Sequence, residues 1–145
     1  FVADADPSVT SDPLDADTDD DGLSDGMEDA DQNGAVGMGE SDPLEIDTDG
    51  DGLNDGTESQ VVVDAVPMPG MSPNGTMFAG TDTGSPAFVP DLDPSSGTDP
   101  SEPDSDDDGL CDGSPAVALS CSGAEDQNND GATVNTIGDS ESSKR

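Results

Sequence analysis

Apolar and polar residues along this chain do not follow the period of a long helix or strand. Pro and Gly recur every few residues, and no segment keeps a 3.6-residue apolar period beyond one turn. The densest apolar stretch falls within residues 59–97, where Val61, Val62 and Val63 predict a short strand. The prolines of that stretch favour extended or turning backbone. We therefore expect little regular secondary structure, with short β-strands confined to 59–97.

The composition argues against a conventional hydrophobic core. The formal net charge is −34, because 36 acidic residues face only Lys144 and Arg145, and Leu, Ile, Val and Phe make up 22 of the 145 residues. Chains this charged and this poor in apolar residues rarely bury enough apolar surface to fold. Order must therefore come from bound cations, from neighbouring copies of the chain, or from both. The charge excludes nucleic acid and anionic membranes as partners, and no apolar run is long enough to enter a membrane.

The acidic residues belong to an internal repeat. Residues 11–28 read "SDPLDADTDDDGLSDGME", residues 41–58 read "SDPLEIDTDGDGLNDGTE", and residues 98–115 read "TDPSEPDSDDDGLCDGSP". Each copy contains a loop of pattern D-x-D-x-D-G-L-x-D-G, which we call a strong loop and which starts at Asp17, Asp47 or Asp104. A shorter pattern, D-x-[DN]-x-[ND]-G, follows at 29–40 and 126–139, and we call these two the weak loops.

The strong loops have the residue types and spacing of a calcium site. Aspartates at positions one, three and five converge on one centre, Gly at position six permits the turn, and position seven supplies a backbone carbonyl. The Asp at position nine binds directly or through water, and the Glu at position twelve closes the shell. Magnesium prefers fewer protein ligands, and zinc would need His or thiolate ligands. The predicted ligands are Asp17, Asp19, Asp21, Leu23, Asp25 and Glu28, then Asp47, Asp49, Asp51, Leu53, Asp55 and Glu58.

The third strong loop departs from this pattern, because Pro115 stands where Glu is expected. We predict that a disulfide between Cys111 and Cys121 draws in the following segment, so that Glu125 completes the shell; two free buried thiols are the alternative. The other ligands of this loop are Asp104, Asp106, Asp108, Leu110 and Asp112. The weak loops would use Asp29, Asp31, Asn33, Ala35 and Glu40, and Asp126, Asn128, Asp130, Ala132 and Asp139. One ion per loop gives about five Ca²⁺ ions.

True EF-hands need a helix on each side of the loop. Asp12-Pro13 lies just ahead of the first strong loop and a weak loop follows Glu28 at once, so there is no room for such helices. The S/T-D-P followed by D-T-D-x-D-G-L-x-D-G resembles the thrombospondin type 3 repeat family, especially its bacterial form. The resemblance covers residues 11–58 and 98–141. It implies calcium ions as the core, backbone wrapped around them, and a role as an extracellular spacer or stalk.

The resemblance and the repeats divide the chain into three parts. Residues 1–58 hold the first two repeats, 59–97 form an insertion, and 98–145 hold the third repeat with its disulfide-closed segment. The insertion is either a disordered linker or an ordered apolar patch that packs between repeats or subunits, and we favour the patch. Asn74-Gly75-Thr76 is an N-glycosylation sequon. The Ser/Thr/Pro-rich residues 81–103 could carry O-linked sugars, but we favour the alternative, a plain solvated linker.

We expect no enzyme, since His is absent and carboxylates committed to a cation are poor general acids. The first functional hypothesis is an extracellular or cell-surface structural module: a rigid stalk, or the subunit of a self-associating fibre, ordered by Ca²⁺. The second is a calcium-dependent adhesin or binding module that uses the insertion. A third is a calcium buffer without structural duty.

Overall fold

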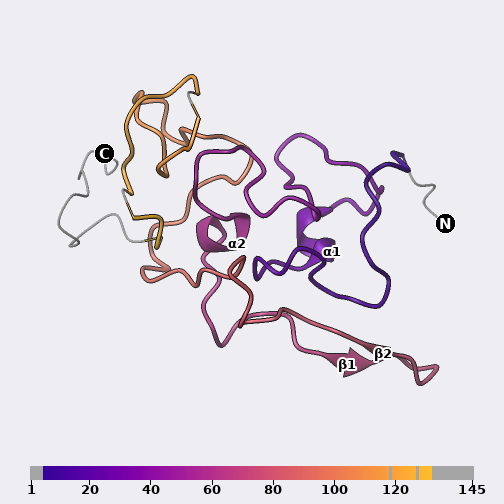
Figure 1. Ribbon diagram of the computed structural model, residues 1–145. Helices are drawn as coiled ribbons and strands as arrows, with labels where there is room; N and C mark the ends of the chain where they lie inside the picture. Colours follow the sequence, from indigo (N-terminus) through magenta and orange to yellow (C-terminus); the bar gives the residue numbers. More distant parts are fainter. Residues whose placement is uncertain (1–4, 118, 127, 132–145) are drawn as a thin grey trace.

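The computed structural model describes residues 5–117, 119–126 and 128–131, and it has little regular secondary structure, as predicted. Two one-turn helices, α1 (Asp25–Glu28) and α2 (Asp55–Glu58), form the last four positions of the first two strong loops. Strands β1 (Gly70–Met71) and β2 (Met77–Phe78) pair antiparallel, with Gly70 opposite Phe78. Figure 1 shows the two helical turns near the centre and the hairpin extending away from them. No helix in the described part is long and apolar enough to span a bilayer.

The strand predicted at Val61, Val62 and Val63 is wrong, and the only two strands among the described residues are β1 and β2. Hydrogen bonding explains the difference. The Val61 N–H donates to the Gly56 carbonyl at 2.9 Å, where it closes the end of α2, and the Val62 carbonyl accepts the Ala65 N–H at 2.8 Å in a tight turn. Local turn contacts thus override the preference of β-branched residues for strands.

The five loops share one backbone conformation. Counting from the first Asp of each loop, position four has φ between 53° and 79°, and position six, always Gly, has φ between 76° and 105°. Glycine adopts this left-handed region without steric cost. In every loop the Asp at position one accepts a hydrogen bond from the N–H of position six, at 2.8–3.1 Å. The repeat in the sequence is therefore also a repeat in the structure.

Successive strong loops pack on one another through the same two positions. The N–H of Gly56, at position ten of the second loop, donates to Asp21 Oδ2, at position five of the first, at 2.6 Å. The N–H of Gly113 donates to Asp51 Oδ2 in the same way. A Cβ on either glycine would lie less than 3.0 Å from backbone atoms of the preceding loop, so these contacts require glycine. The three strong loops are stacked in chain order.

The insertion packs against the strong loops of its own chain. Its side chains Val61, Val66 and Phe88 form a small buried apolar cluster with Leu23 of the first strong loop. The Thr81 hydroxyl donates to Asp17 of the same loop. From α2, the Thr57 hydroxyl donates to the Val89 carbonyl at 2.6 Å. Apolar burial is thus small and local, as the composition requires.

The predicted disulfide between Cys111 and Cys121 is confirmed, with Cα atoms 5.1 Å apart. A parallel bridge pairs Cys111 with Ala124, and the Glu125 N–H donates to the Cys111 carbonyl at 2.8 Å. Glu125 is buried. The disulfide and the bridge therefore bring Glu125 beside the strong loop that lacks a Glu at position twelve.

Candidate metal centres

Four groups of carboxylates in the described residues each bring three ligand atoms within 4.8 Å of one another, close enough for one metal ion to contact all three. Three groups are positions one, three and five of the strong loops, and the fourth belongs to the first weak loop. Every member is a residue that the sequence pattern predicted as a ligand. Several Asp and Glu clusters of this chain could therefore hold metal ions. The groups are Asp17, Asp19 and Asp21; Asp29, Asp31 and Glu40; Asp47, Asp49 and Asp51; Asp104, Asp106 and Asp108.

Local hydrogen bonds hold these side chains on the inside of each turn. In the strong loops, the carboxylate at position three accepts the N–H of position five at 3.0–3.2 Å. The carboxylate at position five accepts the N–H of position seven at 2.7–3.0 Å. Short Asp side chains that fold back onto the backbone in this way explain why the loops use Asp far more than Glu.

Seven buried side-chain oxygens in the described residues accept no hydrogen bond. An oxygen in this condition costs about 1–3 kcal/mol, and more when it is charged. Six of the seven belong to predicted ligands, which is the arrangement that a cation-binding loop needs. These six are Asp17 Oδ1, Asp19 Oδ2, Glu28 Oε2, Asn33 Oδ1, Asp49 Oδ2 and Glu58 Oε2.

The strong loops are also strongly electronegative. Burial, followed by the charges of neighbouring aspartates, raises the pKa of Glu28 to about 9 and that of Glu58 to about 10. The same causes raise the pKa of Asp19 and of Asp49 to about 7. The chain's two basic residues are its last two and lie outside the described part. These carboxylates can therefore be ionised together at neutral pH only when a cation neutralises them.

The Ser/Thr-Asp-Pro motif of one repeat supports the Glu of the preceding strong loop. The Ser41 hydroxyl donates to Glu28 Oε1 at 3.3 Å, and the Thr98 hydroxyl donates to Glu58 Oε1 at 2.9 Å. In both cases Oε2 is the oxygen that accepts no hydrogen bond from the described residues. The sequence carried a signal for this contact, since a hydroxyl residue begins the motif in all three copies.

Position nine of the strong loops makes a contact that the sequence analysis did not predict. Its carboxylate accepts hydrogen bonds from both the N–H and the hydroxyl of position two. Both oxygens are engaged within the loop, so this residue holds the loop closed, and a contact with an ion fits best through water. The pairs are Asp25 with Thr18, Asp55 with Thr48, and Asp112 with Ser105.

The remaining predicted ligands differ in their surroundings. Asp106 and Asp108 of the third strong loop are exposed, whereas Asp17 and Asp21 of the first are fully buried. Glu125 lies beside the third loop but outside its close carboxylate group. Among the residues predicted to offer carbonyls, Leu23 and Leu53 are buried, and Leu110 and Ala35 are half-buried. Ala132 and Asp139 lie outside the described residues.

In the second weak loop, one carboxylate organises the backbone. Asp126 is 1% exposed and accepts four N–H groups, from residues 128 to 131, at 2.8–3.0 Å. The Asn128 amide donates to Asp130 Oδ2 at 2.5 Å. Only two carboxylates, Asp126 and Asp130, lie in the described part of this loop, and it is not among the four close groups.

The seventh oxygen without a hydrogen bond is Asp91 Oδ2, which lies outside all the repeats. Asp91 belongs to the insertion and is 4% exposed. Asp91 is not part of the repeat pattern from which the ligands were predicted. The only signal was local: Asp91 and Asp93 alternate in "DLDP", as acidic residues do in the loops.

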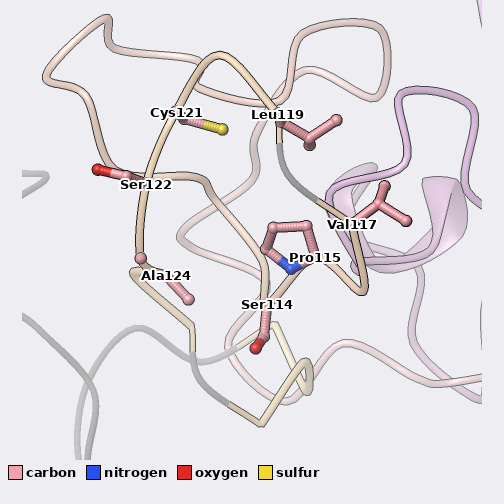
Figure 2. A pocket seen from close by; sticks show the side chains of 8 residues that line it. Ser114, Pro115, Val117, Leu119, Cys121, Ser122 and Ala124 are labelled. Carbon is pink, nitrogen blue, oxygen red and sulfur yellow. The ribbon is translucent and has the colours of Figure 1, made fainter.

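Two further features lie outside the acidic loops. Asn74, the candidate glycosylation site, is exposed in the turn between β1 and β2, where its Oδ1 accepts the Thr76 N–H at 3.1 Å. The segment after the third strong loop lines an open pocket between Pro115, Val117 and Leu119 on one side and the Cys121–Ala124 stretch on the other (Figure 2). None of the described residues that line the pocket is acidic, so it is separate from the carboxylate groups.

Comparison with protein-family models, with curated proteins and with solved structures found no match for this chain.

Proposed function

We propose that this chain is an extracellular calcium-binding structural repeat protein, organised like the thrombospondin type 3 repeats that its sequence resembles. In this proposal about five Ca²⁺ ions, one per loop, replace the apolar core and order the loops. The ordered chain acts as a rigid stalk or as the subunit of a fibre. The disulfide supports a location outside the cell, where such bonds persist.

The observation that carries the proposal is the burial of carboxylates that have no basic partner among the described residues. Asp21, Asp51 and Asp55 are 0% exposed, and Glu28 and Glu58 are at most 2% exposed. Buried charges are normally paired or bound to metal. Protonation of these carboxylates is the alternative way to remove their charge. It would not explain why the oxygens at positions one, three and five of each strong loop lie within 4.8 Å of one another.

Calcium fits these loops better than other ions. Carboxylate, carbonyl and water oxygens are the ligands that Ca²⁺ takes, in shells of six to eight with flexible geometry. Magnesium demands a smaller octahedral shell that keeps several waters. The chain has no His, and both cysteines are in the disulfide, so the nitrogen and thiolate ligands of zinc are absent from the described residues.

The test is removal and return of Ca²⁺ from the full chain. Chelation is expected to abolish chemical-shift dispersion in NMR spectra and to change the circular dichroism spectrum, and Ca²⁺ at millimolar concentration should restore both where Mg²⁺ does not. A calcium buffer without structural duty would lose ions with no change in either spectrum. That result would contradict the proposal.

A double variant tests the ligand assignment. Asp19→Ala with Asp21→Ala should remove the ion of the first strong loop, counted by isothermal titration or by elemental analysis after dialysis. The control, Asp64→Ala with Glu102→Ala, removes the same charge from two exposed residues and should keep every ion. Full stoichiometry in the first variant would contradict the assignment.

A ligand-binding module is the second candidate function, favoured by the hairpin of the insertion. Met68, Met71 and Met77 lie in or beside β1 and β2 and are 63–73% exposed. Exposed methionines suit a contact surface, either for the next copy in a fibre or for another ligand. Filaments of the Ca²⁺-loaded chain in electron micrographs would favour the fibre. A monomer at all concentrations that binds a ligand saturably would favour the binding module.

A further inference from the structure

Asp91 carries an unexplained buried charge. Its Oδ1 accepts the Asp93 N–H at 2.8 Å, while its Oδ2 is buried and accepts no hydrogen bond from any described residue. Its backbone is fixed, because the Asp91 N–H donates to the Val61 carbonyl at 2.9 Å and the nearby Val89 carbonyl accepts the Thr57 hydroxyl at 2.6 Å. A carboxylate held this firmly in a buried place needs a positive partner.

The carboxylate of Asp91 lies directly against the second weak loop. A Cβ built on Gly131, at position six of that loop, would fall within 3.0 Å of both Oδ1 and Cγ of Asp91. The Leu92 N–H donates to the Asp130 carbonyl at 2.9 Å, and the Ser96 hydroxyl donates to the Gly131 carbonyl at 3.1 Å. The end of the insertion therefore wraps the turn of this loop and presents Asp91 to it.

The charged groups around Asp91 in the described part of the chain are all negative. Burial raises the pKa of Asp91, and the carboxylates of Asp93, Asp126 and Asp130 raise it further. Burial also raises the pKa of Asp126, and the charge of Asp130 adds to it. These acidic groups come from two segments 35 residues apart, from Asp91 to Asp126. Their approach is unfavourable unless a cation lies between them.

The described part of the second weak loop has fewer acidic ligands than the first weak loop. The first weak loop reaches a close group of three carboxylates only because Glu40, from further along the chain, joins Asp29 and Asp31. The described part of the second weak loop has two carboxylates, with Asn128 between them. The predicted ligand Asp139 lies outside the described residues, and among the described ones Asp91 is a carboxylate that lies against the loop. Asp91, Asp126 and Asp130 do not form a group as close as the other four, so an ion held by all three would draw their side chains together.

We propose that Asp91 of the insertion is a direct ligand of a divalent cation, Ca²⁺, held by the second weak loop together with Asp126 and Asp130. This inference rests on the proposed calcium-binding function and adds to it a ligand outside the repeat pattern. The insertion is then part of a metal centre as well as a packing element. Metal at this site ties the insertion to the last loop, and so links the middle of the chain to its C-terminal part.

The experiment compares the full chain with Asp91→Asn, and with Asp64→Asn as the matched control. Asn keeps the size of the side chain and the Oδ1 acceptor for Asp93, and it removes the charge. Asp64 is an exposed Asp of the same insertion. After chelation and dialysis, Ca²⁺ alone is titrated calorimetrically into each chain.

Asp91→Asn is expected to bind one Ca²⁺ fewer than the wild type, or to bind one ion ~10-fold or more weakly, since even residues that only orient a metal ligand have effects of that size. Asp64→Asn should match the wild type. Adding Asp126→Asn to Asp91→Asn should remove no second ion, because both residues serve one site. Loss of two ions in the double variant would overturn the proposal, and so would an unchanged count and affinity in Asp91→Asn.

Thermal unfolding separates a metal ligand from a purely structural residue. The unfolding temperature is measured at the lowest Ca²⁺ concentration that keeps the wild type folded and again at millimolar Ca²⁺. The added Ca²⁺ should raise the unfolding temperature of the wild type more than that of Asp91→Asn, because the variant lacks one site. Equal destabilisation in both conditions would mean that Asp91 has a structural role only, and would overturn the proposal. A wild-type chain that binds no Ca²⁺ would overturn the proposed function as well, whereas a normal wild-type titration with an unchanged Asp91→Asn overturns this inference alone.

Discussion

The stacking of the strong loops predicts different effects of one substitution at position ten. A methyl group at this position would meet backbone atoms in the second and third strong loops, but it would have free space in the first. Gly26, Gly56 and Gly113 all occupy position ten. A Cβ on Gly56 would lie less than 3.0 Å from the Asp21 carbonyl oxygen, whereas a Cβ on Gly26 would meet nothing within 4 Å. Gly56→Ala and Gly26→Ala are therefore the same chemical change in two different environments.

The expected magnitudes follow from these environments. Forcing a methyl group against backbone costs about 1–3 kcal/mol. The displacement also weakens the hydrogen bond from the Gly56 N–H to the Asp21 carboxylate, and bonds to charged groups are worth about 1.5–3 kcal/mol. Against this, Ala is favoured over Gly in a helical turn by about 0.8–1.0 kcal/mol. Gly56→Ala should lose ~2–4 kcal/mol of unfolding free energy, and Gly26→Ala should be neutral or stabilised by up to ~1 kcal/mol.

Urea denaturation in millimolar Ca²⁺, followed by circular dichroism, measures both variants and the wild type. The midpoint of Gly56→Ala should fall well below that of the wild type, with an unchanged slope, and Gly113→Ala should behave similarly because its Cβ would meet backbone of the second loop. If Gly56→Ala were as stable as Gly26→Ala, the strong loops would not be stacked as described, and the reasoning would be refuted.

Three further outcomes are expected. Phe88→Ala removes the largest side chain of the apolar cluster and should lower the unfolding free energy by ~3 kcal/mol in the same denaturation assay. Leu92 is exposed, so Leu92→Ala is the control and should be nearly neutral. Equal effects of the two variants would contradict the packing. Replacing Cys111 and Cys121 by Ser removes the disulfide, which should stabilise the fold by about 3 kcal/mol. Titration calorimetry should then show weaker Ca²⁺ binding by the third strong loop, while the first two strong loops keep their ions. The pKa of Glu28 and Glu58 is raised in the fold, so their contribution to the stability of the Ca²⁺-free chain is complete below their ordinary pKa and is lost as pH rises toward about 9 and about 10. The Ca²⁺-free chain should therefore show more order by circular dichroism at pH 5 than at pH 8, and the opposite trend would contradict the burial of these groups.

The sequence by itself determined the local structure of the loops. Alternating aspartates with Gly at position six permit few backbone conformations other than the observed turn, in which position one accepts the N–H of position six. The three predicted carboxylates of each strong loop consequently lie together. The disulfide was predicted from the extracellular character of this acidic, repeat-rich chain, with two free thiols as the alternative, and the structure confirms it. Local interactions dominate here, and they can be derived from residues close in sequence.

Only the tertiary structure decided how the loops and the insertion fit together. A hydroxyl residue begins the motif in every repeat, but only the fold shows that Ser41 and Thr98 donate to the Glu of the preceding loop. No local pattern showed that Gly56 would pack on Asp21. Asp91 was one acidic residue among 36 until the fold buried it beside Gly131. The physical reason is that burial and the approach of like charges depend on segments distant in sequence, which a repeat pattern does not specify.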